Sequence, residues 1–488
     1  MITVRSSSTL PFRLLVVLGI LTIPAAANGN GNVSHQWVTH AAIDATPEGG
    51  SLRLLVDDAA LRPMLDTGTM FPDWGYTPGA TAQERDAGEA SHWEPVQDAY
   101  REWILANYAP PWSEDARRHL AFYLGMTSHG MADQSYDAMF FERSEFYDPV
   151  DHSEFDQDTD VMWAATTGPG MVPRAWIPAA PMLELFQSIV GVGIDEPSMT
   201  QQVGFVGVGI AGVNLLADDP AQVAAAEADY PWAAVHDDDP AVPGNPPHEA
   251  EIVRRYWRSN WALLHGDTLP RPVLWTHPAD GSAGHDITAV SIESWISVVF
   301  ARALSAAALD VGQFHVVDSS GGEVPLQLQL FYGDGSHVVH LRPMIDLLPD
   351  EVYVVTVDPD VTTIHGESLP GWSFTFSTGD RAVPPLNDDG VWDVPDPYGE
   401  DDGGSSGGEG TSGGVADETG SAGSTTTIGT STTTGDAPST SGSSTAGASG
   451  GDEGAGGCGC VQSERGRGPF GFGWLVLGWL MVVRRRTA

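Results

Sequence analysis

Apolar and polar residues alternate with a helical period over the first part of the chain, from about residue 32 to residue 266. In stretches such as 182–192 and 252–264, large apolar side chains recur three and four residues apart, so they share one face of a helix. Small polar and acidic residues precede several stretches, as expected at helix N-termini. This part of the chain is therefore predicted to be mainly helical.

Two predicted helix starts are specific enough to name. Ser113 is followed by two acidic residues, whose charges complement the positive end of a helix dipole, and it predicts a helix that continues through His129. Ser91 and Glu94 are three residues apart, which is the spacing of a capping box, and they predict a helix that begins at Ser91.

The hydrophobic period shortens near residue 269. Short runs rich in β-branched and aromatic residues follow, and Gly/Asp turns such as 333–335 separate them. Several short strands at such spacing predict a β-sandwich of about 110 residues, which we place at 269–380. The runs are 296–300, 327–331, 352–357 and 372–376.

Both ends of the chain have the composition of targeting or spacer segments. Residues 1–27 combine arginines, an apolar stretch and an Ala-Ala-Ala site, and they predict a cleaved signal peptide. Residues 381–457 are rich in Gly, Ser, Thr and acidic residues, so they bury too little apolar surface to fold and predict a flexible stalk. Residues 458–488 hold Cys458 and Cys460, a short apolar run and three final arginines.

The overall charge of the chain makes some classes of binding partner unfavourable. The chain has a net charge of -43, and none of its basic side chains is a lysine. A polyanion would be repelled over much of such a surface, so nucleic acid is an unfavourable partner. The only two cysteines lie near the C-terminus, so the folded part cannot contain a disulfide. Its core, and any bound metal, must stabilise it instead.

Histidine and aspartate residues that could hold a metal are concentrated between residues 35 and 156. Their nitrogen and oxygen atoms suit zinc, and three of them recur every fourth residue on one predicted helix face. A single His or Asp is more often a cap or a hydrogen-bonded core group, so spacing alone leaves the metal and structural interpretations both open. The candidate ligands are His35, His40, Asp73, His92, His129, Asp133, Asp137, His152 and Asp156.

Three motifs carry a resemblance to a known family. They are SHWEP at residues 91–95, FYLGMTSHGMAD at 122–133 and HSEFDQDTD at 152–160. Together they resemble the catalytic domain of glycosylphosphatidylinositol-specific phospholipase D, within the zinc-dependent phospholipase C superfamily. That superfamily also includes zinc single-strand nucleases. The resemblance implies an all-helical domain over residues 28–268 that holds two or three zinc ions.

The resemblance also implies roles for the candidate ligands. Asp73, His92, His129 and Asp133 would hold one zinc. His152 and Asp156 would hold a second, and His40 would hold a third with Asp133 as a bridge. Asp73 would also orient or deprotonate the attacking water. Two positions depart from the family pattern. Asp137 stands where the family has a histidine. In the secreted phospholipases C the N-terminus of the mature chain also binds a metal, and whether the His35 side chain replaces it here is left open.

Two further resemblances concern the rest of the chain. ISVVFARAL and FTFSTG resemble the opening and closing strands of bacterial Ig-like domains, which implies a spacing or adhesion role without catalysis. The tail resembles MYXO-CTERM sorting signals, which implies C-terminal processing machinery as a partner and attachment at the cell surface. A plain membrane anchor is the alternative for the tail. The other histidines, among them His119, His277 and His285, are interpreted as core or surface groups.

The sequence thus predicts a multi-domain chain. An all-α zinc phospholipase C-like domain is followed by an all-β Ig-like sandwich, a disordered linker and a short hydrophobic C-terminal helix. The predicted function is that of an exported, surface-attached zinc phosphodiesterase acting on phospholipid or glycosylphosphatidylinositol-like substrates. The alternatives are a single-strand nuclease of the same superfamily and a surface adhesion protein without catalysis.

Overall fold

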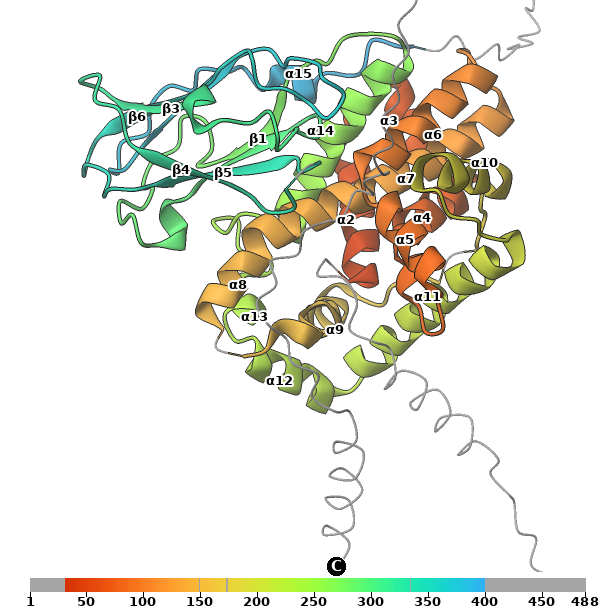
Figure 1. Cartoon of the computed structure of the whole chain (residues 1–488). Helices are drawn as coiled ribbons and strands as arrows, with labels where there is room; N and C mark the ends of the chain where they lie inside the picture. The colour runs from red at the N-terminus through yellow and green to blue at the C-terminus, as the bar shows by residue number, and fades with distance from the viewer. Residues whose placement is uncertain (1–30, 149, 173, 334, 400–488) are drawn as a thin grey trace, which may run out of the picture. The chain divides into compact units, whose positions relative to one another are not determined.

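The computed structural model describes residues 31–148, 150–172, 174–333 and 335–399 (Figure 1). The expected signal peptide at 1–27, the sorting tail at 458–488 and most of the expected stalk lie outside the described residues. Helices occupy the chain up to residue 264, and strands begin at residue 273, as the change of hydrophobic period predicted.

The helical domain, residues 31–266, is built around one long buried helix. Every residue of α7 from Leu120 to Ser135 is buried, and α4 and α14 pack along it. The helices and helical turns are α2 Asn32–Ala45, α3 Ser51–Val56, α4 Arg62–Met70, η1 Pro72–Tyr76, α5 Ala82–Ser91, α6 Glu94–Asn107, α7 Glu114–Ser135, η2 Tyr136–Phe141, α8 Glu142–Tyr147, η3 His152–Glu154, α9 Phe155–Thr167, α10 Ala179–Leu185, η4 Phe186–Val190, α11 Glu196–Ala217, α12 Pro220–Asp229, α13 Ala233–His236 and α14 Pro246–Leu264.

One of the two predicted helix starts is confirmed and the other is wrong. The Ser113 side chain accepts a hydrogen bond from the Ala116 N–H and caps α7, as expected. Ser91 instead ends α5, and its hydroxyl donates to a backbone carbonyl one turn earlier. The capping box of this region is at Thr81, at the start of α5. Glu94 does begin α6, but its carboxylate binds groups of the β-sandwich and caps nothing locally.

The crossing of α4 over α7 requires two glycines. A Cβ atom on Gly68 would lie 2.1 Å from the Phe122 carbonyl oxygen, and one on Gly125 would lie 2.1 Å from the Leu65 carbonyl oxygen. Any other residue at either position would force the helices apart. This close approach brings the end of α4 beside His129 of α7.

The β-sandwich has the two antiparallel sheets expected of its class. One sheet has the order β1-β2-β5-β4 and the other the order β3-β6-β7. Inward-facing aliphatic and aromatic residues such as Val298, Val339 and Phe374 are fully buried between them. The strands are β1 Val273–His277, β2 Ile296–Phe300, β3 Phe314–Asp318, β4 Leu326–Leu330, β5 Val338–Pro343, β6 Val352–Val357 and β7 Trp372–Ser377.

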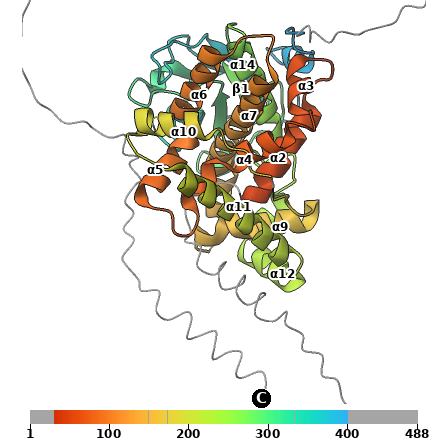
Figure 2. The ribbon, with the colours of Figure 1, turned by 90° about the vertical axis from the view of Figure 1, so that its right-hand side faces the viewer.

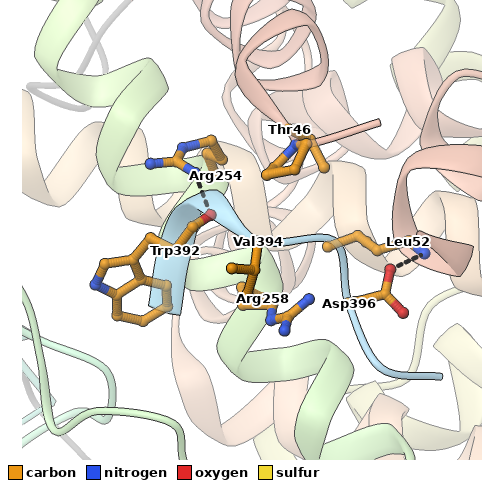
Figure 3. Close-up of a pocket in the computed structure, with 8 residues that line it drawn as sticks. Thr46, Leu52, Arg254, Arg258, Trp392, Val394 and Asp396 are labelled. Atoms are coloured by element: carbon orange, nitrogen blue, oxygen red, sulfur yellow. Dashed lines mark hydrogen bonds between the residues drawn. The ribbon is translucent and has the colours of Figure 1, made fainter. Parts of the chain in front are cut away.

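The chain leaves the β-sandwich and folds back onto the helical domain. This return segment, residues 388–398, contains the short helix α15 Gly390–Asp393 and buries Trp392. Arg254 donates a hydrogen bond to the Trp392 carbonyl, and Asp396 accepts one from the Leu52 N–H (Figure 3). The start of the stalk, expected at residue 381, therefore differs from the structure, because one buried tryptophan and one carboxylate order an otherwise polar stretch.

A buried cluster of charges joins α6 to the β-sandwich. Arg302 lies 3.0 Å from Glu94 and 2.5 Å from Asp98, and His337 lies 3.2 Å from Glu94. His365 lies 3.1 Å from each of the two carboxylates. Hydrogen bonds to Asp98 and Glu94 raise the pKa of His365 to about 9. Positive groups of the sandwich thus compensate two carboxylates of the helical domain.

Replacing Arg302 with methionine is expected to lower the free energy of unfolding by about 3–5 kcal/mol, because buried carboxylates would lose a partner. Urea unfolding of the purified chain measures this effect. Arg118→Met is the control, since Arg118 pairs with Glu114 at the surface and such pairs contribute only about 0–1 kcal/mol. Equal effects of the two substitutions would contradict a stabilising role for the cluster.

Candidate metal centre

Four elements of the helical domain bring five candidate ligands together. His35 lies on α2, Asp73 lies in η1, and His92 follows the last residue of α5. His129 and Asp133 lie one turn apart on α7. These positions are up to 98 residues apart in the chain, so tertiary packing alone assembles them.

The side-chain atoms of this group converge on a small volume. Nε2 of His35 lies 2.9 Å from one Asp133 oxygen, and Nε2 of His129 lies 3.3 Å from the other. Nε2 of His92 lies 3.4 Å from Asp133 and 3.5 Å from Asp73. Two sets of three ligand atoms, His35 with His129 and Asp133, and Asp73 with His92 and His129, each fit within 4.8 Å. His129 belongs to both sets.

The imidazole nitrogens that face this volume make no hydrogen bonds. Nε2 of His35, His92 and His129 is buried and has no hydrogen-bond partner within the described residues, although carboxylate oxygens lie close by. A buried polar atom without a partner is costly, and a metal ion would supply that partner to all three nitrogens at once. We therefore find that the residues present fit a bound metal ion.

Hydrogen bonds on the far side of two rings hold the imidazoles in a ligating form. Nδ1 of His129 donates to the Thr69 carbonyl at 2.7 Å, which is possible because Gly68 and Gly125 let α4 approach α7. Nδ1 of His92 donates to the Gly88 carbonyl at 2.9 Å. With the proton on Nδ1, the Nε2 lone pair is available to a metal.

The electrostatics favour ionised carboxylates in the centre. Burial opposes the charge of Asp133, but His129 and His35 outweigh it and hold the pKa of this carboxyl well below its usual range. Burial likewise opposes the charge of Asp73, and His129 and His92 lower its pKa. Burial lowers the pKa of His129 and so favours its neutral form. Two anionic oxygens and the neutral imidazole of His129 are donors that zinc binds. Burial opposes the charge of His92, but the interaction with Asp73 and the charge of Asp133 outweigh it and raise the pKa of His92 to about 9, so this ring releases a proton when a metal binds.

Two residues outside the ligand set position it. Asp160 accepts hydrogen bonds from the Val33 and Ser34 N–H groups, at 3.0 and 2.8 Å, and so caps α2 from another helix. This cap holds His35, one residue further along. Asn32 donates to the second oxygen of Asp73 at 3.0 Å. Asp160 is in the HSEFDQDTD motif, so the sequence contained a signal for it, whereas Asn32 had none.

The remaining candidate ligands do not belong to either of these two ligand sets. His40 pairs with Asp66 at 2.8 Å, so His35, and not His40, approaches Asp133. His152 bonds Ser144 and the Val150 carbonyl, and its ring packs on Phe141, Phe155 and Tyr230. None of the ligand sets among the described residues includes His40, Asp137, His152 or Asp156.

Asp137, the position that departs from the family pattern, faces the β-sandwich. It is fully buried in η2, and the Tyr332 hydroxyl donates a short hydrogen bond to it. Burial, together with the charge of Asp133, raises the pKa of Asp137 well above its usual range. The Tyr332 ring also packs against Trp93, next to His92, with ring centroids 4.7 Å apart. Sequence reasoning missed Tyr332, because nothing local connects it to residues about two hundred positions earlier.

A third set of ligand atoms comes from the charge cluster described above. Glu94, Asp98 and His365 also place three ligand atoms within 4.8 Å. Arg302 lies against both carboxylates, so their charge is already compensated without an ion. The expectation that the histidines of the β-sandwich are plain core or surface groups is therefore too simple for His337 and His365, which pair with carboxylates of the helical domain.

Comparison with known proteins finds a matching domain family and a set of similar enzymes. Residues 267–378 match the bacterial Ig-like domain family. The chain is 33% identical over 125 residues, 26% of its length, to the phosphatidylinositol-glycan-specific phospholipase D of Dictyostelium discoideum. The enzymes of that name from Rattus norvegicus and Bos taurus are 31% identical over 137 residues and 27% identical over 191 residues.

These matches span 13–22% of the length of the relatives and 25–36% of this chain. They show homology to phosphatidylinositol-glycan-specific phospholipase D over about a quarter of the chain. A solved structure of the S-layer protein SbsC aligns with a TM-score of 0.19 and 10% identity, too low to indicate a shared fold.

Proposed function

We propose that this chain is an exported zinc phosphodiesterase that hydrolyses phospholipid or glycosylphosphatidylinositol-like substrates. The observation that carries the proposal is the convergence of three buried, unbonded imidazole nitrogens on two ionised carboxylates in a chain homologous to phospholipases D. Zinc in such a donor set supplies a Lewis acid and lowers the pKa of bound water, as phosphodiester hydrolysis at neutral pH requires.

The five residues of the centre have two different roles in the proposed reaction. His35, His92, His129 and Asp133 are buried and bind the metal. The Asp73 side chain is 19% exposed, against 9% or less for the other four, so it is the ligand that substrate and water can reach. The Asn32 amide fixes one Asp73 oxygen and leaves the other facing the histidines. Asp73 therefore orients the attacking water and accepts its proton.

Export and surface attachment complete the proposal. The signal peptide at 1–27 and the tail with Cys458 and Cys460 support it through their composition. In this arrangement the stalk separates the catalytic domain from its anchor in the outer envelope, where processing machinery would have cut the tail near the cysteines.

Hydrolysis by the zinc-loaded chain tests the proposal. From phosphatidylcholine, phosphatidylinositol or a glycosylphosphatidylinositol-linked protein we expect one of two product pairs. Cleavage on the glycerol side of phosphorus releases diacylglycerol and the phosphorylated head group, and cleavage on the head-group side releases phosphatidic acid and the free head group. Asp73→Asn should lower the rate at least about 100-fold, because the amide cannot accept the proton. Circular dichroism should show an unchanged fold.

The outcomes separate the alternatives. Hydrolysis of single-stranded nucleic acid alone would favour the nuclease alternative, although the net charge of -43 weighs against it. Failure on every phosphodiester with metal bound would leave a surface protein that binds without catalysis. An Asp73→Asn variant with full activity would remove Asp73 from the reaction.

A further inference from the structure

One helix of the helical domain exposes an apolar face beside the metal centre. Along α11, Phe205, Val208 and Leu215 are 38, 52 and 48% exposed. Phe205 and Val208 are three residues apart and Val208 and Leu215 are seven apart, which places all three on one side of the helix. Figure 1 shows α11 at the edge of the helical domain, and Figure 2, viewed from that side, shows it in front.

The loop before α10 extends this apolar face. Met171 and Val172 are 51 and 56% exposed. A Cβ atom on Gly207 of α11 would lie only 2.9 Å from a Val172 methyl carbon, so loop and helix are in contact. We call Met171, Val172, Phe205, Val208 and Leu215 the apolar face. Exposed apolar side chains gathered on a helix and on the loop that touches it mark an interaction site.

The apolar face is tied to the metal centre by hydrogen bonds. The Gln36 side chain accepts from the Met171 N–H at 2.8 Å and donates to the Met171 carbonyl at 2.6 Å. Gln36 is adjacent to His35 on α2. On the inner side of α11, Gln202 accepts from the Thr77 hydroxyl at 2.6 Å, directly after η1. The elements that carry two ligands therefore hold the apolar face in place.

The apolar face carries no charge on an otherwise strongly acidic protein. No ionisable residue occurs from 197 to 217, whereas acidic residues flank both ends of α11 and the whole chain has a net charge of -43. Acidic flanks repel anionic lipid head groups, while an uncharged apolar face suits a zwitterionic lipid surface. Its five side chains offer almost no hydrogen-bonding groups, unlike the interfaces between proteins, which carry roughly one hydrogen bond per 100–200 Å².

We infer that the apolar face binds the surface of a zwitterionic lipid bilayer and so places the metal centre beside the lipid head groups. The inference rests on the proposed function. Among the described helices, α11 is the one long and apolar enough to cross a membrane by length and composition. However, its inner face, with Met199, Val203 and Ile210, is buried in the domain. The helix therefore lies along the bilayer surface and does not span it.

Binding to vesicles tests this inference without any catalysis. The zinc-loaded chain should sediment with phosphatidylcholine vesicles. The double substitution Phe205→Asp and Val208→Asp should reduce its partition coefficient at least about tenfold, because both carboxylates would have to enter the apolar zone. Val290→Asp is the matched control, since Val290 is 86% exposed on the β-sandwich and should leave binding unchanged.

A local probe separates the apolar face from the C-terminal tail. With both native cysteines changed to serine, a nitroxide label on Val208→Cys should gain oxygen accessibility when vesicles are added. The same label on Val290→Cys should not. No change at position 208, or equal binding by the double variant and the wild type, would overturn the inference. A halved molecular mass of the double variant in sedimentation would also overturn it and assign the face to a second copy of this chain.

Substrate form separates this inference from the proposed function. The double variant should hydrolyse a water-soluble phosphodiester such as p-nitrophenylphosphocholine at the wild-type rate but lose at least about tenfold on phosphatidylcholine vesicles. Loss on both substrates would place the face in the catalytic machinery and overturn the inference. If the wild type hydrolyses neither substrate, the proposed function is contradicted. The vesicle-binding experiments still test whether the apolar face binds a bilayer.

Discussion

Replacing His129 with alanine is expected to empty the metal centre and abolish hydrolysis. His129 belongs to both ligand sets, is fully buried, and is held by the Thr69 carbonyl. Changing groups that merely surround metal ligands typically costs roughly 10–100-fold in affinity, so loss of a shared ligand should cost more. Elemental analysis of the dialysed protein, together with the hydrolysis rate, measures both effects.

His119→Ala is the matched control for this substitution. His119 lies on the same helix, is also buried, and hydrogen-bonds the Tyr100 hydroxyl at 2.7 Å, far along α7 from the ligands. The control should lower stability yet keep its metal and its rate. If both variants retain one metal ion per chain, His129 is not a ligand and the centre must be assigned to other residues.

Removing the metal is expected to lower the melting temperature by about 10 °C. A ligand that binds only the folded state adds about 4 kcal/mol when its concentration is a thousandfold above its Kd, and each kcal/mol shifts the melting temperature by roughly 2–4 °C in a domain of this size. The physical reason lies in the buried imidazole nitrogens, which lose their partner. No cysteine occurs among the described residues, so no disulfide can replace the metal.

Calorimetry with and without a chelator, followed by added zinc, measures the effect. Zinc should restore both the melting temperature and the hydrolysis rate. The His129→Ala variant should melt at one temperature whether or not the chelator is present, which controls for other effects of the chelator. An unchanged wild-type melting curve, with less than one metal ion per chain, would contradict the metal centre itself.

The order and class of the domains were predictable because they depend on local pattern. A helical period up to residue 264 and short β-branched runs from residue 273 reflect burial on one face of each element. The start of α7 was predictable for the same reason, since Ser113 caps it within one turn. Ser91 misled because capping-box spacing is satisfied equally well by a residue that ends one helix and a residue that starts the next.

Part of the metal centre was also visible in the sequence. His129 and Asp133 are one helical turn apart, so their shared face follows from the period of the helix. That His35 reaches Asp133 while His40 pairs with Asp66 did not follow from spacing. Both histidines lie on α2, five residues apart and so on different faces, and Asp160 caps this helix next to His35, the one that faces the centre.

The sequence by itself determined the helical domain, the β-sandwich and the types of residue able to hold a metal, since periodicity and side-chain chemistry are local properties. Only the tertiary structure decided which candidate ligands meet. It also decided that the Tyr332 hydroxyl donates a hydrogen bond to Asp137 and that the charge of Arg302 compensates the charges of Glu94 and Asp98. Each of these contacts joins residues far apart in the chain. Such contacts depend on how closely helices and sheets pack. A single sequence indicates that closeness only indirectly, for example through Gly68 and Gly125, where α4 and α7 leave no room for a Cβ atom.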